Sequence, residues 1–273
     1  MPHINVDGVR FNTRIDGPEG APWLTFSNSL ATDLGLWDAQ VVLLEDRFRI
    51  FRYDTRGHGQ SGATSPPYDF ARLEADVIGL WDAMGIARSH YMGLSLGGST
   101  GIGLAIHHAD RLLSLAACDC RVTSPTAFKQ TWGSRIEVAL EEGMDGLVED
   151  TMTRWFTDPT LEADPPALEK IREMIRTTSV DGFIGCANAL QGVEYFDAID
   201  RITCPTLFLV GAQDPAATPE LIGAMHARVG GSQYVELSDA AHISNIENEA
   251  AFNQAVIDFF DSVVSGEPKT SKI

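Results

Sequence analysis

One serine of this chain lies between two glycines in a pattern that suits nucleophilic catalysis. Residues 93–97 read Gly-Leu-Ser-Leu-Gly, follow an apolar run that predicts a strand, and open a helical pattern. At such a sharp turn the backbone is strained, and the hydroxyl of Ser95 is lifted above the sheet. Glycine at positions 93 and 97 allows the chain to approach closely. The segment therefore predicts a serine nucleophile beside a helix N-terminus, which favours negative charge.

A serine nucleophile needs a base that takes its proton and a carboxylate that orients the base. Of the seven histidines, His242 alone lies on a loop after a late predicted strand, and we expect it to be the base. Asp214 follows the apolar run 207–210, so its carboxylate is expected at the carboxyl end of a strand and is the predicted orienter. Asp119 also follows a predicted strand and could orient the histidine instead.

The oxyanion that forms during attack on a carbonyl needs two N–H donors. The first that we expect is the amide of Leu96, directly after the nucleophile. The second should come from the loop after an early strand, and residues 26–30, Phe-Ser-Asn-Ser-Leu, form that loop. We assign this donor to the amide of Leu30, whose side chain is then free to line a pocket.

Apolar runs alternate with helical patterns along most of the chain, which indicates an α/β fold with a mostly parallel sheet and helices on both faces. The Asp-Gly pair at 7–8 stands between two alternating runs, so we expect an antiparallel hairpin at the sheet edge. Strands are predicted at 23–26, 48–53, 89–92, 112–118, 206–210 and 232–237. Helices are predicted at 70–84, 99–108, 219–229 and 249–264.

The stretch from about Thr123 to Phe196 interrupts this alternation with helical patterns and without a strand-like run. Because it stands between two predicted strands, we expect an inserted helical cap over one end of the sheet. The predicted boundaries are a core of residues 1–123 and 197–264 and a cap of residues 124–196. The polar, lysine-rich residues 265–273 are expected to form a flexible tail.

The composition argues against several classes of function. The 273 residues carry 20 Lys+Arg against 38 Asp+Glu, a net charge of −18. A surface this acidic repels phosphate backbones and anionic membranes, so neither nucleic acid nor membrane is an expected partner. Four scattered cysteines and the lack of leader-like or membrane-spanning apolar runs predict reduced thiols in a cytoplasmic protein. No His/Asp cluster has the spacing of metal ligands, so no metal or cofactor is expected.

Taken together, these motifs resemble the α/β-hydrolase family over nearly the whole chain. The likeness includes the oxyanion loop, an Asp-x-Arg-Gly-x-Gly-x-Ser turn at 54–61, the serine turn, the cap and the late histidine. Within the family, the chain looks most like the 3-oxoadipate enol-lactonases. The stretches that carry this closer likeness are 27–30, 32–34, Trp37, 93–98, 132–136, 154–157, 216–219 and 240–245.

Those lactonases open the enol-lactone ring of a small carboxylate in aromatic catabolism. The resemblance implies that Ser95 attacks the ring, that His242 assists formation of an acyl-enzyme, and that water then hydrolyses this intermediate. It also implies a group that binds the free carboxylate of the substrate. Arg135 in the cap is the candidate, with Trp132 and Trp155 as walls of the pocket.

Other roles for these pocket candidates remain open. Arg135 could form a surface salt bridge with Glu141 or another neighbour, and both tryptophans could pack in the core of the cap. Asp119 is a further pocket candidate, and it departs from the family pattern because small neutral residues are expected where Cys-Asp-Cys stands at 118–120. If Asp119 faces the pocket, it would repel an anionic substrate and favour a neutral one.

Three other functions compete with that of a lactonase. A general carboxylesterase for neutral esters, or a C–C bond hydrolase for a ring-fission diketone, would use the same three groups. A non-catalytic ligand receptor with this fold would need none of them, so the intact set favours an enzyme. In every case the expected ligand is a small molecule.

Overall fold

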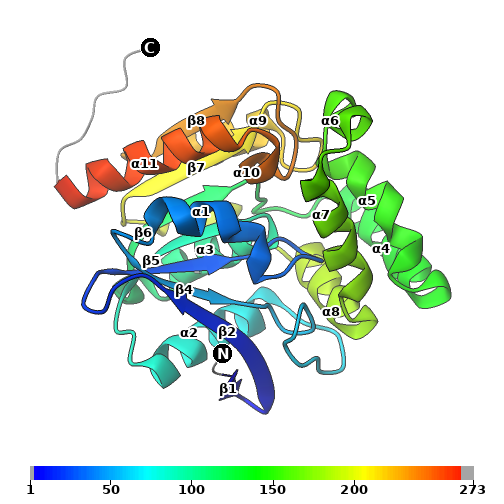
Figure 1. The fold of residues 1–273 in the computed structure, drawn as a ribbon, viewed down its shortest axis with the longest axis horizontal. Coiled ribbons are helices and arrows are strands. Elements are labelled where there is room, and N and C mark those ends of the chain that lie inside the picture. The colour runs from blue at the N-terminus through cyan, green and yellow to red at the C-terminus, as the bar shows by residue number, and fades with distance from the viewer. Residues whose placement is uncertain (1–2, 266–273) are drawn as a thin grey trace.

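A computed structural model describes residues 3–265, which form an eight-stranded sheet with helices on both faces (Figure 1). The strand order is β1-β2-β4-β3-β5-β6-β7-β8, with antiparallel β1–β2 and β2–β4 pairs and parallel pairs elsewhere. The α/β fold class predicted from sequence is confirmed. The predicted flexible tail falls, after Ser265, outside the residues that the structure describes. The strands are β1 (His3–Val6), β2 (Val9–Asp16), β3 (Trp23–Ser27), β4 (Arg49–Tyr53), β5 (Ser89–Leu94), β6 (Leu112–Cys118), β7 (Thr206–Gly211) and β8 (Gln233–Leu237).

The local signals of the sequence explain how several elements begin and end. Asp7 and Gly8 both have positive φ and form the turn between β1 and β2, as the hairpin signature predicts. Helix α2 (Phe70–Met84) begins where the Asp69 side chain accepts a hydrogen bond from the Arg72 amide. It ends at Gly85, whose left-handed conformation closes the helix. These bounds coincide with the predicted helix.

Two hydrophobic clusters lie on opposite faces of the sheet. One contains α1 (Asp38–Leu44) and α11 (Glu249–Ser265), with Trp37 packed against Phe252 at 6.3 Å between ring centroids. The other contains α2, α3 (Leu96–His107) and α9 (Pro219–Arg228), with Trp81 packed against Tyr91. Helix α1 was not predicted from the sequence. The two layers hold the sheet rigidly between them, so its strand ends are well-defined attachment points for functional side chains.

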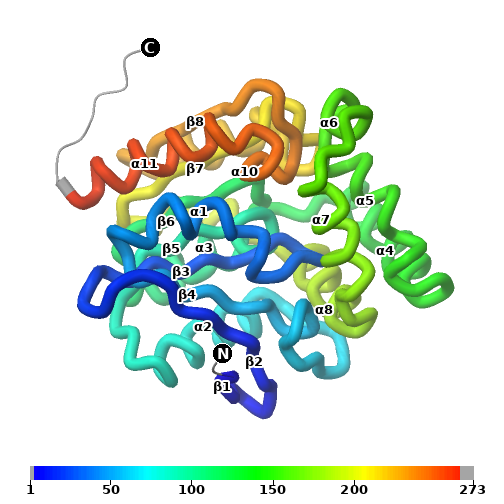
Figure 2. The backbone as a smooth tube through the Cα atoms, viewed as in Figure 1, coloured from blue at the N-terminus to red at the C-terminus, as the bar shows by residue number. Residues whose placement is uncertain are grey.

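Between β6 and β7 the chain forms a helical segment without named strands, and its helices gather at one side of the sheet (Figure 2). An isolated antiparallel bridge between Thr123 and Glu194 brings the two ends of this segment together. That this segment is a separate cap with the boundaries 124–196 stays a prediction. Its helices are α4 (Thr126–Glu142), α5 (Val148–Trp155), α6 (Asp158–Ala163), α7 (Pro166–Thr177) and α8 (Val180–Gln191).

Four polar residues singled out by the sequence follow four neighbouring parallel strands. Ser95 comes after β5, Asp119 after β6, Asp214 after β7 and His242 after β8. Because parallel strands present their carboxyl ends at the same edge, the topology brings these side chains to one end of the sheet. The short helix α10 (Ser244–Glu247) follows directly after the histidine.

Candidate active site

The backbone around Ser95 has the geometry that the two flanking glycines were expected to permit. Ser95 has φ 55° and ψ −112°, a conformation that L-residues rarely adopt. A Cβ at Gly93 would lie 2.3 Å from the carbonyl oxygen of Gly97, and a Cβ at Gly97 would lie 2.3 Å from that of Ser27. The Ser95 amide donates to Cys118 O at 2.8 Å, which ties the turn to the end of β6. The surrounding chain therefore holds Ser95 in its strained conformation.

The serine, histidine and aspartate expected to act together form a continuous hydrogen-bonded chain. His242 Nε2 lies 2.8 Å from Ser95 Oγ, and His242 Nδ1 lies 2.7 Å from Asp214 Oδ2. The other carboxylate oxygen of Asp214 accepts hydrogen bonds from the amides of Ala216 and Ala217. The Asp214 side chain is fully buried and that of His242 is nearly so. The aspartate can therefore hold the imidazole with Nε2 directed at the serine hydroxyl.

The surroundings of His242 shift the pKa of its imidazole. Burial disfavours the charged imidazolium, but the charge of Asp214 and its hydrogen bond more than offset this effect. The charge of Asp119 adds to the increase and that of Arg154 opposes it, and the net result is a raised pKa for His242. An imidazole of this kind can accept the serine proton and stabilise the charge that it acquires.

Asp119 lies near Asp214 and His242, but its hydrogen bonds go to residues other than the histidine. Its side chain is buried, with Oδ1 accepting from the Gly211 amide at 2.8 Å and Oδ2 from Ser244 Oγ at 2.5 Å. Burial and the charge of Asp214 raise the pKa of Asp119 well above its ordinary value. Asp214 therefore occupies the position next to Nδ1 for which both aspartates were candidates. Asp119 instead lines a hollow of about 30 Å³ that also borders Ser95.

The two backbone amides predicted to bind an oxyanion have no competing acceptor in the part of the chain that the structure describes. Neither the amide of Leu30 nor that of Leu96 donates to another residue within 3–265. Leu96 is the first residue of α3, so its N–H belongs to the free donors at a helix N-terminus. Leu30 lines the same cavity as Ser95. Both donors are thus available for a negative oxygen.

A cavity of about 40 Å³ lies over Ser95 and His242 and is walled by the helical segment. Trp132 packs edge-on against Phe128, with 5.9 Å between ring centroids, and lies 6.1 Å from the ring of Phe183. Trp155 lies beside the imidazole of His242, 6.4 Å between centroids. Both tryptophans therefore line the cavity and also pack against neighbouring rings, so the two expected roles coexist.

Two arginines reach this cavity from the helical segment, and they differ in their partners. Arg135 is buried, donates to Thr151 Oγ1 at 2.5 Å, and forms an ion pair with Asp150. Burial lowers the pKa of Arg135 to about 10, which still leaves it charged at neutral pH. Arg154 is half-buried and has no hydrogen bond or ion pair with any residue of the range 3–265. The salt bridge of Arg135 is thus formed with Asp150 rather than with Glu141.

Comparison with known proteins places the chain in a family. Residues 22–249 match a family model described as the alpha/beta hydrolase fold. The chain belongs to the α/β-hydrolase family. The resemblance inferred from the sequence motifs is therefore confirmed, and the order serine, aspartate, histidine along this α/β-hydrolase is the order usual for the fold.

Individual relatives of this α/β-hydrolase include lactonases and an esterase. It is 34% identical to "3-oxoadipate enol-lactonase 2" of Acinetobacter baylyi over 253 residues, which cover 93% of this chain and 94% of the relative. The crystal structure of the enol-lactonase from Burkholderia xenovorans LB400 is 41% identical, with a TM-score of 0.91, and the match covers 95% of this chain and 100% of that one. A thermophilic esterase from Thermogutta terrifontis is 28% identical, with a TM-score of 0.88 over 96% and 97% of the two chains. The expected likeness to enol-lactonases is confirmed.

The structure of this α/β-hydrolase also bears on membrane spans, metal ligands and cysteines. Within residues 3–265, no helix is both long and apolar enough to cross a membrane. The same residues contain no group of three or more His, Cys, Asp or Glu arranged to hold a metal ion. Each of the four cysteines is a free thiol, and three of them are buried.

Arg154, which lines the cavity, and Glu247, which contacts the histidine loop, were not among the site residues predicted from the sequence. Arg154 stands next to Trp155, and this adjacency in a stretch that resembles the enol-lactonases was the available signal. Glu247 lies five residues after His242, on the helix that follows the histidine loop. Its contacts depend on a segment 90 residues away along the chain, and no local pattern reports such a contact.

Proposed function

We propose that this α/β-hydrolase opens a small lactone or ester through a covalent acyl-enzyme on Ser95. The single observation that carries this proposal is the hydrogen-bonded chain from Ser95 through His242 to Asp214 at the floor of a cavity. The relatives support the bond type, since an Acinetobacter baylyi relative and a Burkholderia xenovorans structure are both named as enol-lactonases. A serine–histidine–aspartate set needs a carbonyl carbon that the serine oxygen can attack, and lactones and esters provide one.

In the first step, Ser95 Oγ attacks the substrate carbonyl while its proton passes to His242 Nε2. The carbonyl oxygen becomes an oxyanion, to which the amides of Leu30 and Leu96 donate hydrogen bonds. Asp214 stays ionised and stabilises the imidazolium. His242 then protonates the departing oxygen, which in a lactone remains attached to the acyl chain, and the ester bond to Ser95 is complete.

In the second step, a water molecule takes the place of the serine hydroxyl as nucleophile. His242 Nε2 accepts a proton from this water as it attacks the acyl carbon, and the same two amides stabilise the second oxyanion. Collapse of this oxyanion returns the proton to Ser95 Oγ and releases a carboxylic acid. The 2.8 Å contact between His242 Nε2 and Ser95 Oγ lets the serine proton leave and return, while the 2.7 Å contact of Nδ1 with Asp214 keeps the ring in place.

The walls of the cavity indicate the kind of substrate. A volume of about 40 Å³ is small, since one water molecule needs roughly 10–15 Å³ of such space. Phenylalanine and tryptophan rings form part of the wall, and Arg154 supplies a cation without a protein partner among the described residues. We therefore propose a compact substrate with an apolar ring and an anionic substituent, as in an enol-lactone that carries a carboxylate. In this proposal residues 124–196 form the cap that encloses the substrate, and Arg135, Trp132 and Trp155 shape it.

Turnover of a panel of substrates by the wild type and a Ser95→Ala variant tests the proposed function. The panel contains a carboxylated enol-lactone, a neutral aryl ester and a ring-fission diketone, and circular dichroism verifies that the variant is folded. We expect the lactone to be turned over with the highest kcat/KM and Ser95→Ala to abolish hydrolysis. Hydrolysis that survives in Ser95→Ala, or a preference for the diketone, would overturn the assignment of nucleophile or of bond.

A further inference from the structure

The loop that carries His242 is hydrogen-bonded to the segment that forms one wall of the cavity. The amides of His242 and Ile243 both donate to the carbonyl oxygen of Trp155, at 3.1 and 3.2 Å. Trp155 ends helix α5 between β6 and β7, whereas His242 follows β8. The backbone of the proposed base is thus in direct contact with the backbone of the proposed pocket wall.

The carboxylate of Glu247 makes a second connection between the same two segments. Its Oε1 accepts hydrogen bonds from both the amide and the hydroxyl of Thr157, each at 2.7 Å. Its Oε2 accepts from the amide of Ala241 at 2.6 Å, one residue before His242. Hydrogen bonds to an ionised carboxylate are shorter and stronger than those between neutral groups. Glu247 therefore fastens residues 155–157 to the residue before the histidine.

We infer that Glu247 is a positioning residue that holds His242 and the Arg154–Trp155 wall in one fixed arrangement. The inference rests on the proposed function, in which His242 is the base and this wall contacts the substrate. A base displaced by about 1 Å from its nucleophile loses much of its effect, because proton transfer requires hydrogen-bond distance. Glu247 touches neither the substrate nor the reacting atoms, and it acts through the two segments that it joins.

The chemistry of the three donors explains why a carboxylate is needed here. Two donors meet one oxygen of Glu247 and a third meets the other, so both oxygens must accept. A glutamine has one accepting oxygen, and its NH₂ group would face either the Ala241 amide or the Thr157 donors. Glu247→Gln therefore breaks the link on one side while it preserves the size of the side chain.

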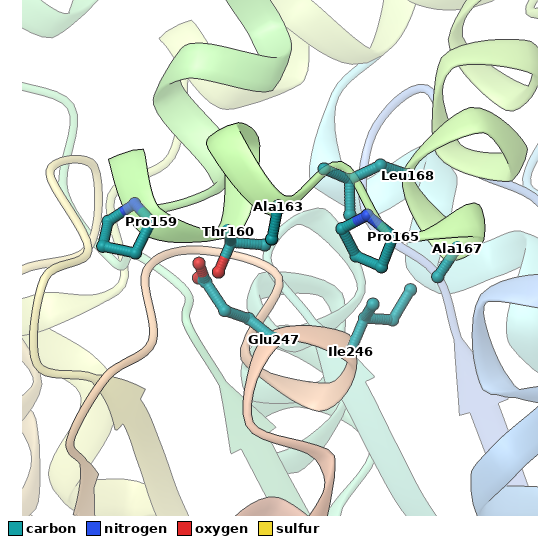
Figure 3. Close-up of a pocket in the computed structure, with 8 residues that line it drawn as sticks. All are labelled: Pro159, Thr160, Ala163, Pro165, Ala167, Leu168, Ile246 and Glu247. Atoms are coloured by element: carbon teal, nitrogen blue, oxygen red, sulfur yellow. The ribbon is translucent and has the colours of Figure 1, made fainter.

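The location of Glu247 allows the substitution to be tested in a folded protein. The side chain borders a groove of about 320 Å³ between α10 and the α6–α7 region, where its carboxylate points toward Thr160 (Figure 3). Glu247 is half-buried, and an isosteric change at a groove creates no cavity in the core. We expect Glu247→Gln to fold with at most a modest decrease in melting temperature.

Two kinetic measurements on the full chain separate positioning from a purely structural role. The first is the rate at which a small neutral phosphonate ester modifies Ser95, which depends on His242 and needs no hydrolysable substrate. The second is KM for the carboxylated enol-lactone, which depends on the Arg154–Trp155 wall. For Glu247→Gln we expect phosphonylation to slow, and KM to rise, each by about tenfold. Thr157→Val, which removes only the hydroxyl donor, should change both in the same direction but less.

Glu249→Gln is the matched control, because Glu249 is exposed at the start of α11. This substitution should leave both the phosphonylation rate and KM unchanged. A Glu247→Gln protein that melts at a lower temperature but keeps the wild-type phosphonylation rate and KM would overturn the inference. So would a change in only one of the two values, because the link acts on base and wall together. If the enol-lactone is not turned over at all, the proposed function fails, whereas the phosphonylation rate still decides whether Glu247 positions the histidine.

Discussion

The guanidinium of Arg135 forms an ion pair with the carboxylate of Asp150, so the cation predicted to bind the substrate is already neutralised by the protein. Thr151 Oγ1 accepts a further hydrogen bond from the same group. Arg154 borders the same cavity and has no such partner within residues 3–265. Arg135 thus links two helices of the helical segment, whereas Arg154 is available to an anionic ligand.

We predict that Arg154→Gln raises KM for a carboxylated lactone by about tenfold, or about 1.4 kcal/mol, and leaves kcat nearly unchanged. The lost contact is made equally in the ground and transition states, so it appears in KM. Steady-state kinetics with a neutral aryl ester is the control, and its KM should stay within about twofold. Arg135→Gln should chiefly lower the melting temperature. The opposite pattern, with Arg135→Gln affecting KM alone, would show that Arg135 binds the carboxylate.

The raised pKa of His242 predicts the acid limb of the pH profile. Activity needs the neutral imidazole, so kcat/KM should fall as the pH drops through the pKa of the free enzyme, which lies above the ordinary value of 6.5. The free energy of unfolding should change in the opposite direction, with the contribution of His242 decreasing as the pH rises. A folded-state pKa above the unfolded one contributes stability that is complete below about 6.5 and is lost as the pH rises through the folded value.

Asp119→Asn provides the matched test of this pH dependence. The asparagine keeps the size of the side chain but removes one of the charges that raise the pKa of His242, alongside Asp214 and against Arg154. The acid limb of kcat/KM should therefore move to lower pH. A limb that stays in place would show that Asp119 does not contribute to the proton affinity of the histidine.

Backbone strain at Ser95 predicts that two inactive variants differ in stability. Both Ser95→Ala and Ser95→Gly lack the hydroxyl, but only alanine keeps a Cβ at φ 55° and ψ −112°. Relief of strain of about 1–3 kcal/mol outweighs the extra chain entropy that glycine loses on folding. We expect Ser95→Gly to be more stable than Ser95→Ala by about 1 kcal/mol in urea denaturation. Equal stability, or a less stable glycine variant, would contradict the idea that the fold maintains this strain.

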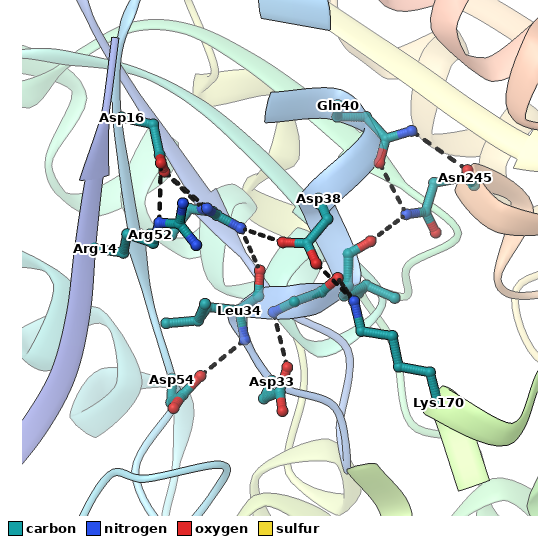
Figure 4. Close-up of polar contacts among 12 residues, drawn as sticks. Arg14, Asp16, Asp33, Leu34, Asp38, Gln40, Arg52, Asp54, Lys170 and Asn245 are labelled. Carbon is teal, nitrogen blue, oxygen red and sulfur yellow. Dashed lines mark hydrogen bonds and ion pairs between the residues drawn. The ribbon is translucent and has the colours of Figure 1, made fainter. Parts of the chain in front are cut away.

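Arg52 in β4 is a buried cation whose loss should destabilise the folded chain. It pairs with Asp16 of β2 and with Asp38 of α1, each at 2.8 Å, and Lys170 of α7 also reaches Asp38 (Figure 4). Arg52→Met leaves the nearly buried Asp16 without its main partner, and we expect a loss of about 3–5 kcal/mol in denaturant unfolding. Arg14→Met is the control, because Arg14 bonds the same aspartate from a side chain that is 45% exposed. It should cost less than about 1 kcal/mol.

The strands that position the catalytic candidates could be predicted from the sequence because each has a clear local pattern. The strands before Ser95 and Asp214 are buried throughout, and that before His242 contains the strand-forming residues Tyr234 and Val235, so their order and the sheet edge could be predicted. Helix α1 was missed because it is only seven residues long and one of its apolar residues, Val42, is exposed. Its apolar residues therefore do not mark one face, and the helical period is weak.

The partners of charged side chains were harder to predict, because they depend on tertiary contacts. Arg135 lies on α4 and Asp150 on α5, and the angle between two helices is not encoded in a local pattern. The same applies to Asp119, whose two oxygens bond groups 92 and 125 residues away. The sequence could place this carboxylate at the correct strand end but could not indicate whether its oxygens face a ligand or the protein.

The hydrogen bonds between residues 155–157 and 241–247 also bear on how such an enzyme can be recombined. A helical segment exchanged between two family members would bring its own Trp155–Thr157 backbone to a histidine loop that matched a different segment. A chimera cut at the two ends of the helical segment therefore divides an interlocked pair of segments that lie far apart in the gene. The smallest exchangeable module is the helical segment together with the stretch 241–247, and crossovers that transfer both should yield active hybrids more often.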